Sequence, residues 1–264
     1  MNGAGNGSSL GTIASPRFVD HPHLVLMDRP GSALAERYRR LRLRLEQGTP
    51  DFPFRPQLTL ITSAVPGEGK TTTATNLALA YAEDRGHRTL LVDADLRRPS
   101  VSRYLDPQPT LGFSDVLAGE SSLDDVLIEM PGSTLWVLPA GTPRATPLAL
   151  LQHECLDRLI TELRRRFHRI VIDSPPTVPF TDAALLASHA DGVLLLVRAG
   201  TTTKPLICRA KESLSGANVL GVVLNDVVFT VVDRYYDQYD DVEPGGRAYA
   251  RQLEAPRLSV GARD

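Results

Sequence analysis

The ten residues 63–72 have the composition and spacing of a loop that binds phosphate groups. They read Ser-Ala-Val-Pro-Gly-Glu-Gly-Lys-Thr-Thr, with an apolar run at 58–61 before them and a helical pattern at 72–80 after them. The two glycines let the main chain approach an anion, and the N-terminus of the following helix directs its amides at the same anion. Lys70 would then reach the β- and γ-phosphates of a nucleotide, and the Thr71 hydroxyl would ligate Mg²⁺.

One position departs from the usual motif, because Ala64 stands where a glycine is expected, five residues before Gly69. Alanine is small enough to keep the turn, but it lowers the specificity of the motif taken alone. A strand-to-helix loop with chance glycines is therefore the alternative. The residues of this loop that we expect to contact a nucleotide are Pro66, Gly67, Glu68, Gly69, Lys70, Thr71 and Thr72.

Two apolar segments further along the chain end in aspartates, which favour the nucleotide site over the chance loop. Segment 89–95 ends in Asp93 and Asp95, and segment 169–173 ends in Asp173. Short apolar runs of this kind are typical of strands buried on both faces, as in a parallel sheet. The C-terminal edge of such a sheet is where ligands bind. One aspartate there could be a cap, whereas three beside a phosphate loop predict an Mg²⁺ shell and a general base.

Composition narrows the class of protein. The chain has 264 residues, enough for one α/β domain with appendages. Its formal net charge of −2 provides no general attraction to nucleic acid or membranes. Cys155 and Cys208 lack metal-ligand spacing, and we expect both to be buried free thiols. Because the sequence has neither a secretion signal nor an apolar run of about eighteen residues, we expect a cytoplasmic protein.

The elements that would position the site alternate between strand and helix from residue 58 onward. Helical patterns lie between the predicted strands, and the clearest of them is at 148–167. This alternation predicts a doubly wound, mostly parallel sheet with helices on both faces. The phosphate-binding loop makes the predicted fold one of the P-loop NTPase type. Strands are predicted at 58–63, 89–93, 134–139, 169–173, 192–197 and 219–224.

The chain divides into three predicted parts: a flexible leader at 1–22, a catalytic domain at 23–232 and a tail at 233–264. The domain begins with a predicted helix at 32–47, whose apolar residues recur at helical spacing beside a densely basic face. The tail is polar and acidic, yet it holds four of the seven tyrosines within its 32 residues. Such a composition is poorly suited to a packed core. An edge strand, or a loop that packs its rings on the surface, is the alternative for the tail.

These segments together resemble the bacterial tyrosine kinases (BY-kinases) of capsule and exopolysaccharide synthesis, which are P-loop proteins related to the Par/Min ATPases. The similarity runs from about residue 34 to the C-terminus. Residues 90–99, Leu-Leu-Val-Asp-Ala-Asp-Leu-Arg-Arg-Pro, match the second Walker segment of that family. Residues 172–176 and 181–183 are similar to its Walker B region, and residues 36–42 fit its Glu-x-x-Arg-x-x-Arg motif.

The resemblance implies an ATP- and Mg²⁺-dependent tyrosine autokinase that regulates polysaccharide synthesis or export. Lys70 and Mg²⁺ would neutralise the charge of the transferred phosphoryl group. Asp93 would be the base, while Asp95 and Asp173 would hold the metal with Thr71, although these roles could be exchanged. Asn225, at the end of a predicted strand, would bind adenine or serve as a structural cap. The acceptors, in a neighbouring subunit, would be Tyr235, Tyr236, Tyr239 and Tyr249.

The resemblance also implies partners. Glu36, Arg39 and Arg42 fall close to one side of the first helix and would hold a neighbour in a ring-shaped homo-oligomer while the tail is unphosphorylated. A solvated basic face is the alternative, and a basic helix could also touch anionic lipid. We expect a separate membrane-embedded polysaccharide co-polymerase to activate the chain at the inner face of the membrane. A cognate phosphatase would reset it, and no nucleic-acid partner is expected.

Two other functions compete with the kinase. A Par/Min-type partitioning ATPase would carry a second lysine five residues before Lys70, and Val65 stands there instead. A non-catalytic, nucleotide-binding regulator of the polysaccharide machinery is the other alternative. The presence of the motif lysine and all three aspartates argues against it.

Overall fold

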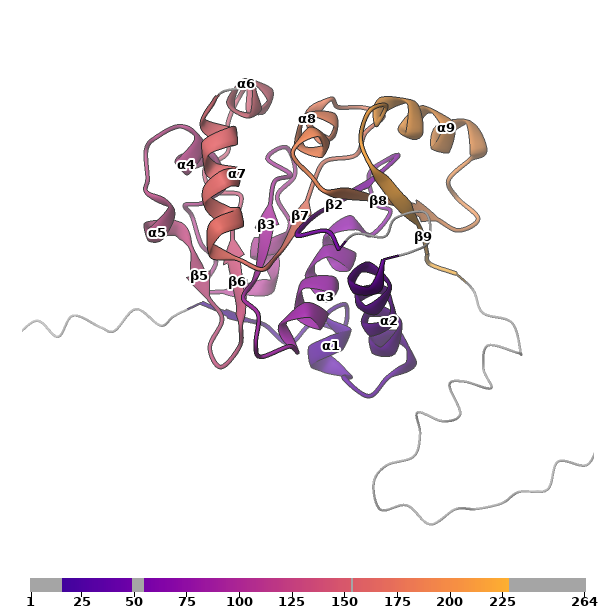
Figure 1. Cartoon of the computed structure of the whole chain (residues 1–264), viewed down its shortest axis with the longest axis horizontal. Helices are drawn as coiled ribbons and strands as arrows, with labels where there is room; N and C mark the ends of the chain where they lie inside the picture. The colour runs from indigo at the N-terminus through magenta and orange to yellow at the C-terminus, as the bar shows by residue number, and fades with distance from the viewer. Residues whose placement is uncertain (1–15, 49–54, 153, 228–264) are drawn as a thin grey trace, which may run out of the picture. The chain divides into compact units, whose positions relative to one another are not determined.

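The computed structural model describes residues 16–48, 55–152 and 154–227 (Figure 1). Within these residues, seven strands form one sheet in the order β5-β6-β3-β7-β2-β8-β9. Every neighbouring pair is parallel except β5 and β6. This arrangement confirms the predicted doubly wound, mostly parallel sheet. The strands are β2 Leu58–Ser63, β3 Thr89–Asp93, β5 Ile128–Glu129, β6 Leu135–Leu138, β7 Arg169–Asp173, β8 Gly192–Arg198 and β9 Val219–Asn225.

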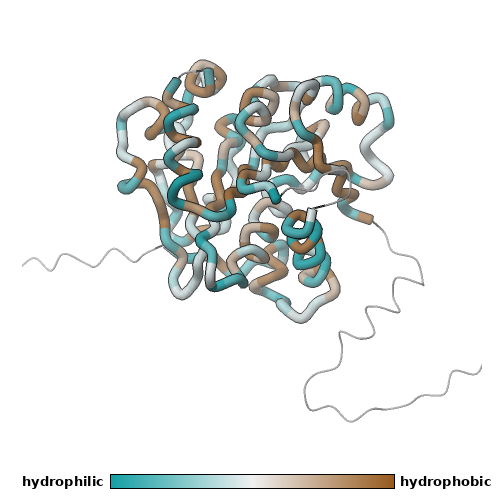
Figure 2. Tube along the Cα trace, viewed as in Figure 1, coloured by the Kyte–Doolittle hydropathy of each residue, from teal (hydrophilic) through white to brown (hydrophobic). Residues whose placement is uncertain are grey.

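Helices cover both faces of this sheet. Alternate strand residues face opposite sides, so Leu90 and Val92 join one core cluster while Leu91 joins the other. The first cluster packs under α4 Phe113–Leu117, α5 Leu123–Val126, α6 Pro147–Leu151, α7 Glu154–Arg166, α8 Asp182–Ser188 and α9 Lys204–Ser213. The second packs against α2 Ala33–Gln47 and α3 Lys70–Ala82. Figure 2 shows hydrophobic residues concentrated in the strands between these two layers.

Residues before 23 are part of the fold. Strand β1 Arg17–Phe18 pairs antiparallel with β4 Leu105–Asp106, and the Val19 N–H donates to the Tyr104 carbonyl at 2.8 Å. The short helix α1 Val25–Asp28 then packs against α3. The structured region therefore begins before the expected boundary between the leader 1–22 and the domain 23–232. Residues 1–15 and the tail 233–264 lie outside the described residues.

Two expectations need correction, one about a helix and one about the cysteines. The pattern at 148–167 forms two helices, because α6 ends at Leu151 and α7 begins at Glu154. Helix α6 packs against α4 and α8 and contributes Leu151 to the core cluster that the apolar face of α7 also joins. The expectation of two buried thiols was wrong for Cys208, which is exposed on α9, while Cys155 is half-buried. Among the described helices, none has both the length and the apolar character needed to cross a membrane.

Candidate active site

The phosphate-binding loop lies between the end of β2 and the start of α3. Gly67 and Gly69 adopt left-handed backbone conformations, with φ of 83° and 91°. A side chain is disfavoured at such angles, and a Cβ atom on Gly69 would also lie 2.1 Å from the side-chain nitrogen of Asn225. Ala64 is fully buried and does not adopt a positive φ. The alanine at this position is therefore compatible with the turn.

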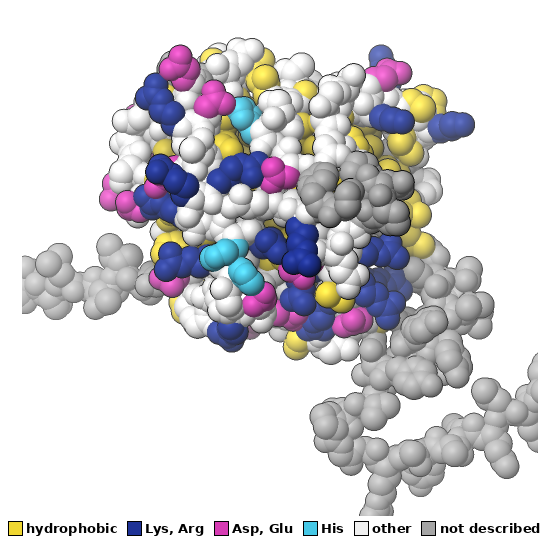
Figure 3. Space-filling view, viewed as in Figure 1, with side chains coloured by type: hydrophobic (Ala, Val, Ile, Leu, Met, Phe, Trp, Pro, Cys, Tyr) yellow, Lys and Arg dark blue, Asp and Glu magenta, His cyan; other side chains and the backbone are white. Residues whose placement is uncertain are grey.

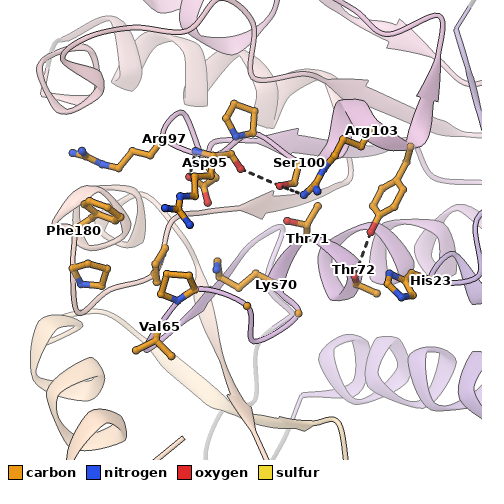
Figure 4. A pocket seen from close by; sticks show the side chains of 18 of the residues that line it. His23, Val65, Lys70, Thr71, Thr72, Asp95, Arg97, Ser100, Arg103 and Phe180 are labelled. Carbon is orange, nitrogen blue, oxygen red and sulfur yellow. Dashed lines mark hydrogen bonds between the residues drawn. The ribbon is translucent and has the colours of Figure 1, made fainter. Parts of the chain in front are cut away.

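A cavity of 1110 Å³ opens over this loop (Figure 4). Its floor is formed by six of the seven loop residues expected to contact a nucleotide, Pro66, Gly67, Gly69, Lys70, Thr71 and Thr72. Val65 of the same loop also lines the cavity, and the other lining residues come from the segment after β3, from the loop after β7 and from His21 and His23. The expected phosphate-binding residues therefore share one cavity with groups from several distant parts of the chain.

Glu68 is the loop residue that does not line this cavity. Its side chain is buried, and its carboxylate accepts hydrogen bonds from the backbone N–H groups of Val65 and Arg198, at 2.8 and 3.2 Å, and from the Thr202 hydroxyl. Its carbonyl accepts a 2.9 Å bond from the side-chain amide of Asn225. Glu68 thus ties the loop to β8 and the segment before α9. Asn225, expected to bind adenine or to serve as a cap, makes a structural contact with the backbone of the loop.

Thr71 and Asp173, two of the predicted metal ligands, are in direct contact. The Thr71 hydroxyl donates a 2.6 Å hydrogen bond to Oδ2 of Asp173. Asp173 is fully buried, and its Oδ1 has no hydrogen-bond partner among the described residues. Burial, followed by the charge of Asp93, raises the pKa of Asp173 well above its usual value. A carboxylate in this state gains from a bound cation, which relieves both the desolvation and the unpaired oxygen.

These groups fit Mg²⁺ bound together with a nucleotide. Mg²⁺ prefers oxygen ligands and is usually held by one or two carboxylates plus substrate phosphates. The described residues contain no cluster of three or more His, Cys, Asp or Glu side chains able to hold a metal. Thr71 and Asp173 supply oxygen atoms beside Lys70, and Asp95 lines the same cavity. The protein therefore provides part of a magnesium shell, which the phosphates of a nucleotide would complete.

Asp93 and Asp95 have different surroundings, although they follow one strand. Asp93 is fully buried, and its Oδ2 accepts bonds from the N–H groups of Ser100 and Val101, both at 2.9 Å. Its Oδ1 accepts a 3.2 Å bond from the Asp95 N–H. Desolvation raises the pKa of Asp93 to about 6, although the Val101 and Ser100 bonds oppose the rise. Asp93 thus holds the segment after β3 in place, whereas Asp95 is the carboxylate that lines the cavity.

A paired arginine lines the cavity, and the sequence motifs did not indicate this pairing. Arg97 donates two hydrogen bonds to the buried carboxylate of Asp182, at 2.7 and 3.0 Å, and lies 4.2 Å from the ring centre of Phe180. This contact joins the segment after β3 to the start of α8. Arg97 and Asp182 belong to segments that the motif analysis quoted, so a signal for them existed. His21, His23 and Arg103 carried no such signal.

The predicted oligomerisation residues on α2 make contacts within the same chain. Arg39 binds the Glu83 carboxylate at 2.7 Å and the Pro30 carbonyl at 2.8 Å, and it lies 3.5 Å from Glu36. Arg42 donates a 2.7 Å bond to the Ala80 carbonyl near the end of α3. Figure 3 shows basic side chains gathered over α2 with acidic ones among them. Arg39 and Arg42 thus secure α2 against the end of α3 in the single chain.

Three of the seven tyrosines lie in the described residues, and none of these three is exposed. Tyr81 and Tyr104 are buried, with 2% and 7% exposure, and Tyr38 is half-buried. The expected acceptors Tyr235, Tyr236, Tyr239 and Tyr249 lie outside the described residues.

Comparisons with known proteins find a matching family, similar sequences and a similar solved structure. The family described as "AAA domain" matches residues 60–203. The chain is 34% identical over 205 residues to the tyrosine-protein kinase YwqD of Bacillus subtilis, covering 77% of this chain and 85% of that protein. It is 33% identical over 232 residues to the succinoglycan biosynthesis transport protein ExoP of Rhizobium meliloti, covering 86% of this chain and 29% of that protein. The crystal structure of the chimerical protein CapA2B2 superposes with a TM-score of 0.74 at 31% identity, covering 84% of this chain and 97% of that chain.

Proposed function

The chain belongs to the bacterial tyrosine kinase family, and from this membership we propose that it is an ATP-dependent tyrosine autokinase that regulates polysaccharide synthesis or export. The observation that carries the proposal is the contact between Thr71 and the buried Asp173, because Thr71 lines the cavity over the phosphate-binding loop together with Lys70 and Asp95. Charge neutralisation and positioning are what phosphoryl transfer requires of a protein. This site supplies groups suited to both.

The loop and the start of α3 hold the phosphates of ATP. Backbone N–H groups between Pro66 and Thr72 point at the anion, and Lys70 neutralises the charge that spreads over the transferred phosphoryl group. Bound Mg²⁺ supplies further charge neutralisation, and Thr71 and Asp173 are the residues that would hold it. The Glu68 and Asn225 contacts keep the loop in shape before ATP arrives. Because the loop is already ordered, none of the free energy of ATP binding is lost in ordering it.

The incoming tyrosine hydroxyl loses its proton to a carboxylate, and we assign this role to Asp95. Asp95 lines the cavity, whereas both oxygens of Asp93 accept backbone hydrogen bonds. A base must come within hydrogen-bond reach of the proton that it removes. We therefore move the role of base, which the sequence suggested for Asp93, to Asp95, and Asp93 becomes a positioning residue.

The acceptors in this proposal are the tail tyrosines, Tyr235, Tyr236, Tyr239 and Tyr249, of a neighbouring subunit. The low exposure of Tyr38, Tyr81 and Tyr104 supports the choice, because side chains packed within the domain cannot reach another subunit's site without local unfolding. A ring-shaped homo-oligomer would present each tail to the next subunit. We propose that Glu36, Arg39 and Arg42 contribute to this contact, for which the two arginines would exchange their partners on α3.

Phosphorylation would then drive the ring apart. Each phosphate adds about −1.5 to −2 charges near neutral pH, beside a tail that already holds Asp237, Asp240, Asp241 and Glu243. A more negative tail is repelled from Asp95 and from the phosphates of a bound nucleotide. Light scattering on unphosphorylated and phosphorylated protein tests this cycle, since a mass that stays constant or rises on phosphorylation contradicts it.

Partners outside the chain complete the proposal. A membrane-embedded polysaccharide co-polymerase would recruit and activate the kinase at the inner face of the membrane, and a phosphatase would reset the tail. The relative ExoP, named as a transport protein for succinoglycan biosynthesis, is longer than this chain and contains a matching region. A region similar to this chain within a transport protein is consistent with a separate kinase and a separate membrane protein acting together.

The decisive experiment is anti-phosphotyrosine detection after purified protein has been incubated with ATP and Mg²⁺. We expect a signal from the wild type and none from Lys70→Met, because loss of a charge-stabilising group costs about two to three orders of magnitude in rate. Lys211→Met, at an exposed site on α9, is the matched control and should keep the signal. ATP hydrolysis without phosphotyrosine would favour the partitioning ATPase instead, and nucleotide binding without either reaction would favour the regulator.

A further inference from the structure

The part of the cavity wall formed by the segment after β3 carries more basic side chains than phosphate binding requires. Arg97, Arg98 and Arg103 line the cavity in addition to Lys70. Asp95 is the one carboxylate among the described residues that form its lining. The phosphate-binding loop, the start of α3 and Lys70 already form an anion site at the floor. The arginines on the wall therefore invite a separate explanation.

Two of these arginines have no acidic partner in the described part of the chain. The charge of Arg97 is engaged by the Asp182 carboxylate. Arg98 makes no side-chain hydrogen bond or ion pair with any described residue, and Arg103 donates to the neutral hydroxyl of Ser100. Both residues are exposed. We call Arg98 and Arg103 the basic rim.

The backbone that carries the basic rim is held in place. Asp93 accepts the N–H groups of Ser100 and Val101, and the Arg98 N–H donates to Asp95 at 3.0 Å. The 3-10 helix Val101–Tyr104 follows directly and includes Arg103. Figure 4 shows Arg103 beside Ser100, on the opposite side of Asp95 from Arg97 and Phe180. The basic rim therefore lies beside the carboxylate to which we assign the base.

Another part of the cavity wall is apolar. Pro176, Val178, Pro179 and Phe180, from the loop after β7, line it. An aromatic ring can be buried against such a surface. The volume of 1110 Å³ exceeds the range of about 300–1,000 Å³ usual for small-molecule pockets, so an acceptor side chain could enter beside a triphosphate. One ligand that fits both surfaces is a tyrosine with acidic neighbours.

We propose that the basic rim selects acceptor tyrosines flanked by acidic residues, and that its occupant is segment 235–243 from a second copy of the chain. This segment reads Tyr-Tyr-Asp-Gln-Tyr-Asp-Asp-Val-Glu, with four acidic residues and no lysine or arginine. Carboxylates pair well with the fork of donors on arginine. The inference rests on the proposed kinase function and adds the substrate class, which is an acidic tyrosine peptide.

The test uses the full chain with its four tail tyrosines replaced by phenylalanine, so that only an added peptide accepts phosphate. One peptide has the sequence of residues 233–243, and the second has Asn and Gln in place of each Asp and Glu. We expect the KM of the acidic peptide to be about ten-fold lower than the KM of the neutral peptide. The difference should shrink as salt is added, because exposed charges are screened.

Variants of the basic rim test whether its two arginines cause the preference for the acidic peptide. Arg98→Gln with Arg103→Gln should raise the KM of the acidic peptide about ten-fold, to that of the neutral peptide, and leave the KM for ATP unchanged. Arg209→Gln with Lys211→Gln, at exposed positions on α9, is the matched control and should change neither value. Arg98→Glu with Arg103→Glu should prefer a third peptide that has lysine at the five acidic positions. Thermal unfolding confirms that each variant is folded.

The outcomes separate the inference from the function on which it rests. Equal KM values for the acidic and neutral peptides in the wild-type background overturn the inference while leaving the kinase intact. A KM that rises for ATP in the Arg98→Gln, Arg103→Gln variant also overturns it, because the rim would then bind nucleotide. If neither the peptides nor the unmodified tail is phosphorylated, the proposed function itself fails.

Discussion

The side-chain amide of Asn225 donates a 2.9 Å hydrogen bond to the carbonyl of Glu68, so the last residue of β9 holds the phosphate-binding loop. The same amide nitrogen occupies the space that a Cβ atom on Gly69 would need. The edge strand of the sheet and the loop are thereby coupled. A change at position 225 should affect the loop even if the side chain never touches a nucleotide.

We expect Asn225→Ala to weaken ATP and GTP binding by the same factor, about five-fold. The lost bond is of ordinary strength, about 1 kcal/mol, and it positions backbone groups that contact phosphates common to both nucleotides. Fluorescence titration with labelled ATP and GTP measures the effect. Asn218→Ala, which removes a 2.7 Å bond to the Asp191 carbonyl, is the matched control. A loss confined to ATP would show instead that Asn225 recognises adenine.

Asp93→Asn and Asp95→Asn should differ in their effect on stability. Asp93 is fully buried and accepts three backbone N–H bonds, so its replacement should lower the free energy of unfolding by about 1–3 kcal/mol. Asp95→Asn keeps an acceptor oxygen for the Arg98 N–H and should unfold like the wild type. It should lose about 10²–10⁴-fold in transfer rate as the general base. Urea unfolding and initial rates measure both effects, and equal stability of the two variants would contradict the division of roles.

Replacing Tyr235, Tyr236, Tyr239 and Tyr249 by phenylalanine should remove most self-phosphorylation and leave ATP binding unchanged. Phenylalanine keeps the ring and loses only the acceptor hydroxyl. Mass spectrometry of the wild type identifies the phosphorylated tyrosines. Tyr38→Phe is the control variant and should keep its self-phosphorylation. Phosphate found mainly on Tyr38, Tyr81 or Tyr104 would mean that the tail is not the substrate.

Arg39 and Glu83 offer a test of the ring, because they pair at 2.7 Å within one chain. If Arg39 leaves Glu83 and contacts a neighbouring subunit in the ring, Arg39→Ala should dissociate the oligomer, whereas Glu83→Gln should leave it assembled. Glu83→Gln weakens only the intrachain pair, which is half-exposed and worth less than about 1 kcal/mol. Light scattering of the unphosphorylated variants gives their mass. If both remain assembled, the arginine serves only to attach α2 to α3.

Asp191→Asn should lower the free energy of unfolding by about 2 kcal/mol at pH 7 and by much less near pH 3. Burial alone would raise the pKa of Asp191, but the bonds from Arg164 and from the N–H groups of Leu58 and Gln57 lower it below its usual value. The pKa is thus lower in the folded than in the unfolded chain. The stabilisation is present above the unfolded value and is lost as pH falls toward the folded one. Urea unfolding at both pH values measures this, with exposed Asp20→Asn as the control; an equal loss at both would contradict it.

Local sequence determined the strands and the loop of the site. Each strand that carries a site residue is a short apolar run, and β2, β3 and β7 begin and end where the sequence predicts. Runs of this kind have a strong strand signal because both faces are buried. The two-residue strands β1, β4 and β5 have no periodicity that a sequence pattern could register.

The sequence by itself determined which residue types stand at the ends of these strands, and so it determined the chemistry of the cavity. Only the tertiary structure decided what each of them touches. Asp93 and Asp95 are equivalent in a motif, yet the turn at Ser100 and Val101 folds back on Asp93 and leaves Asp95 at the cavity. Glu68 turns away from the ligand for a similar reason, because its partner Thr202 is 134 residues distant. Local patterns are set by neighbours in the chain, whereas a hydrogen-bond partner is set by the packing of the whole sheet.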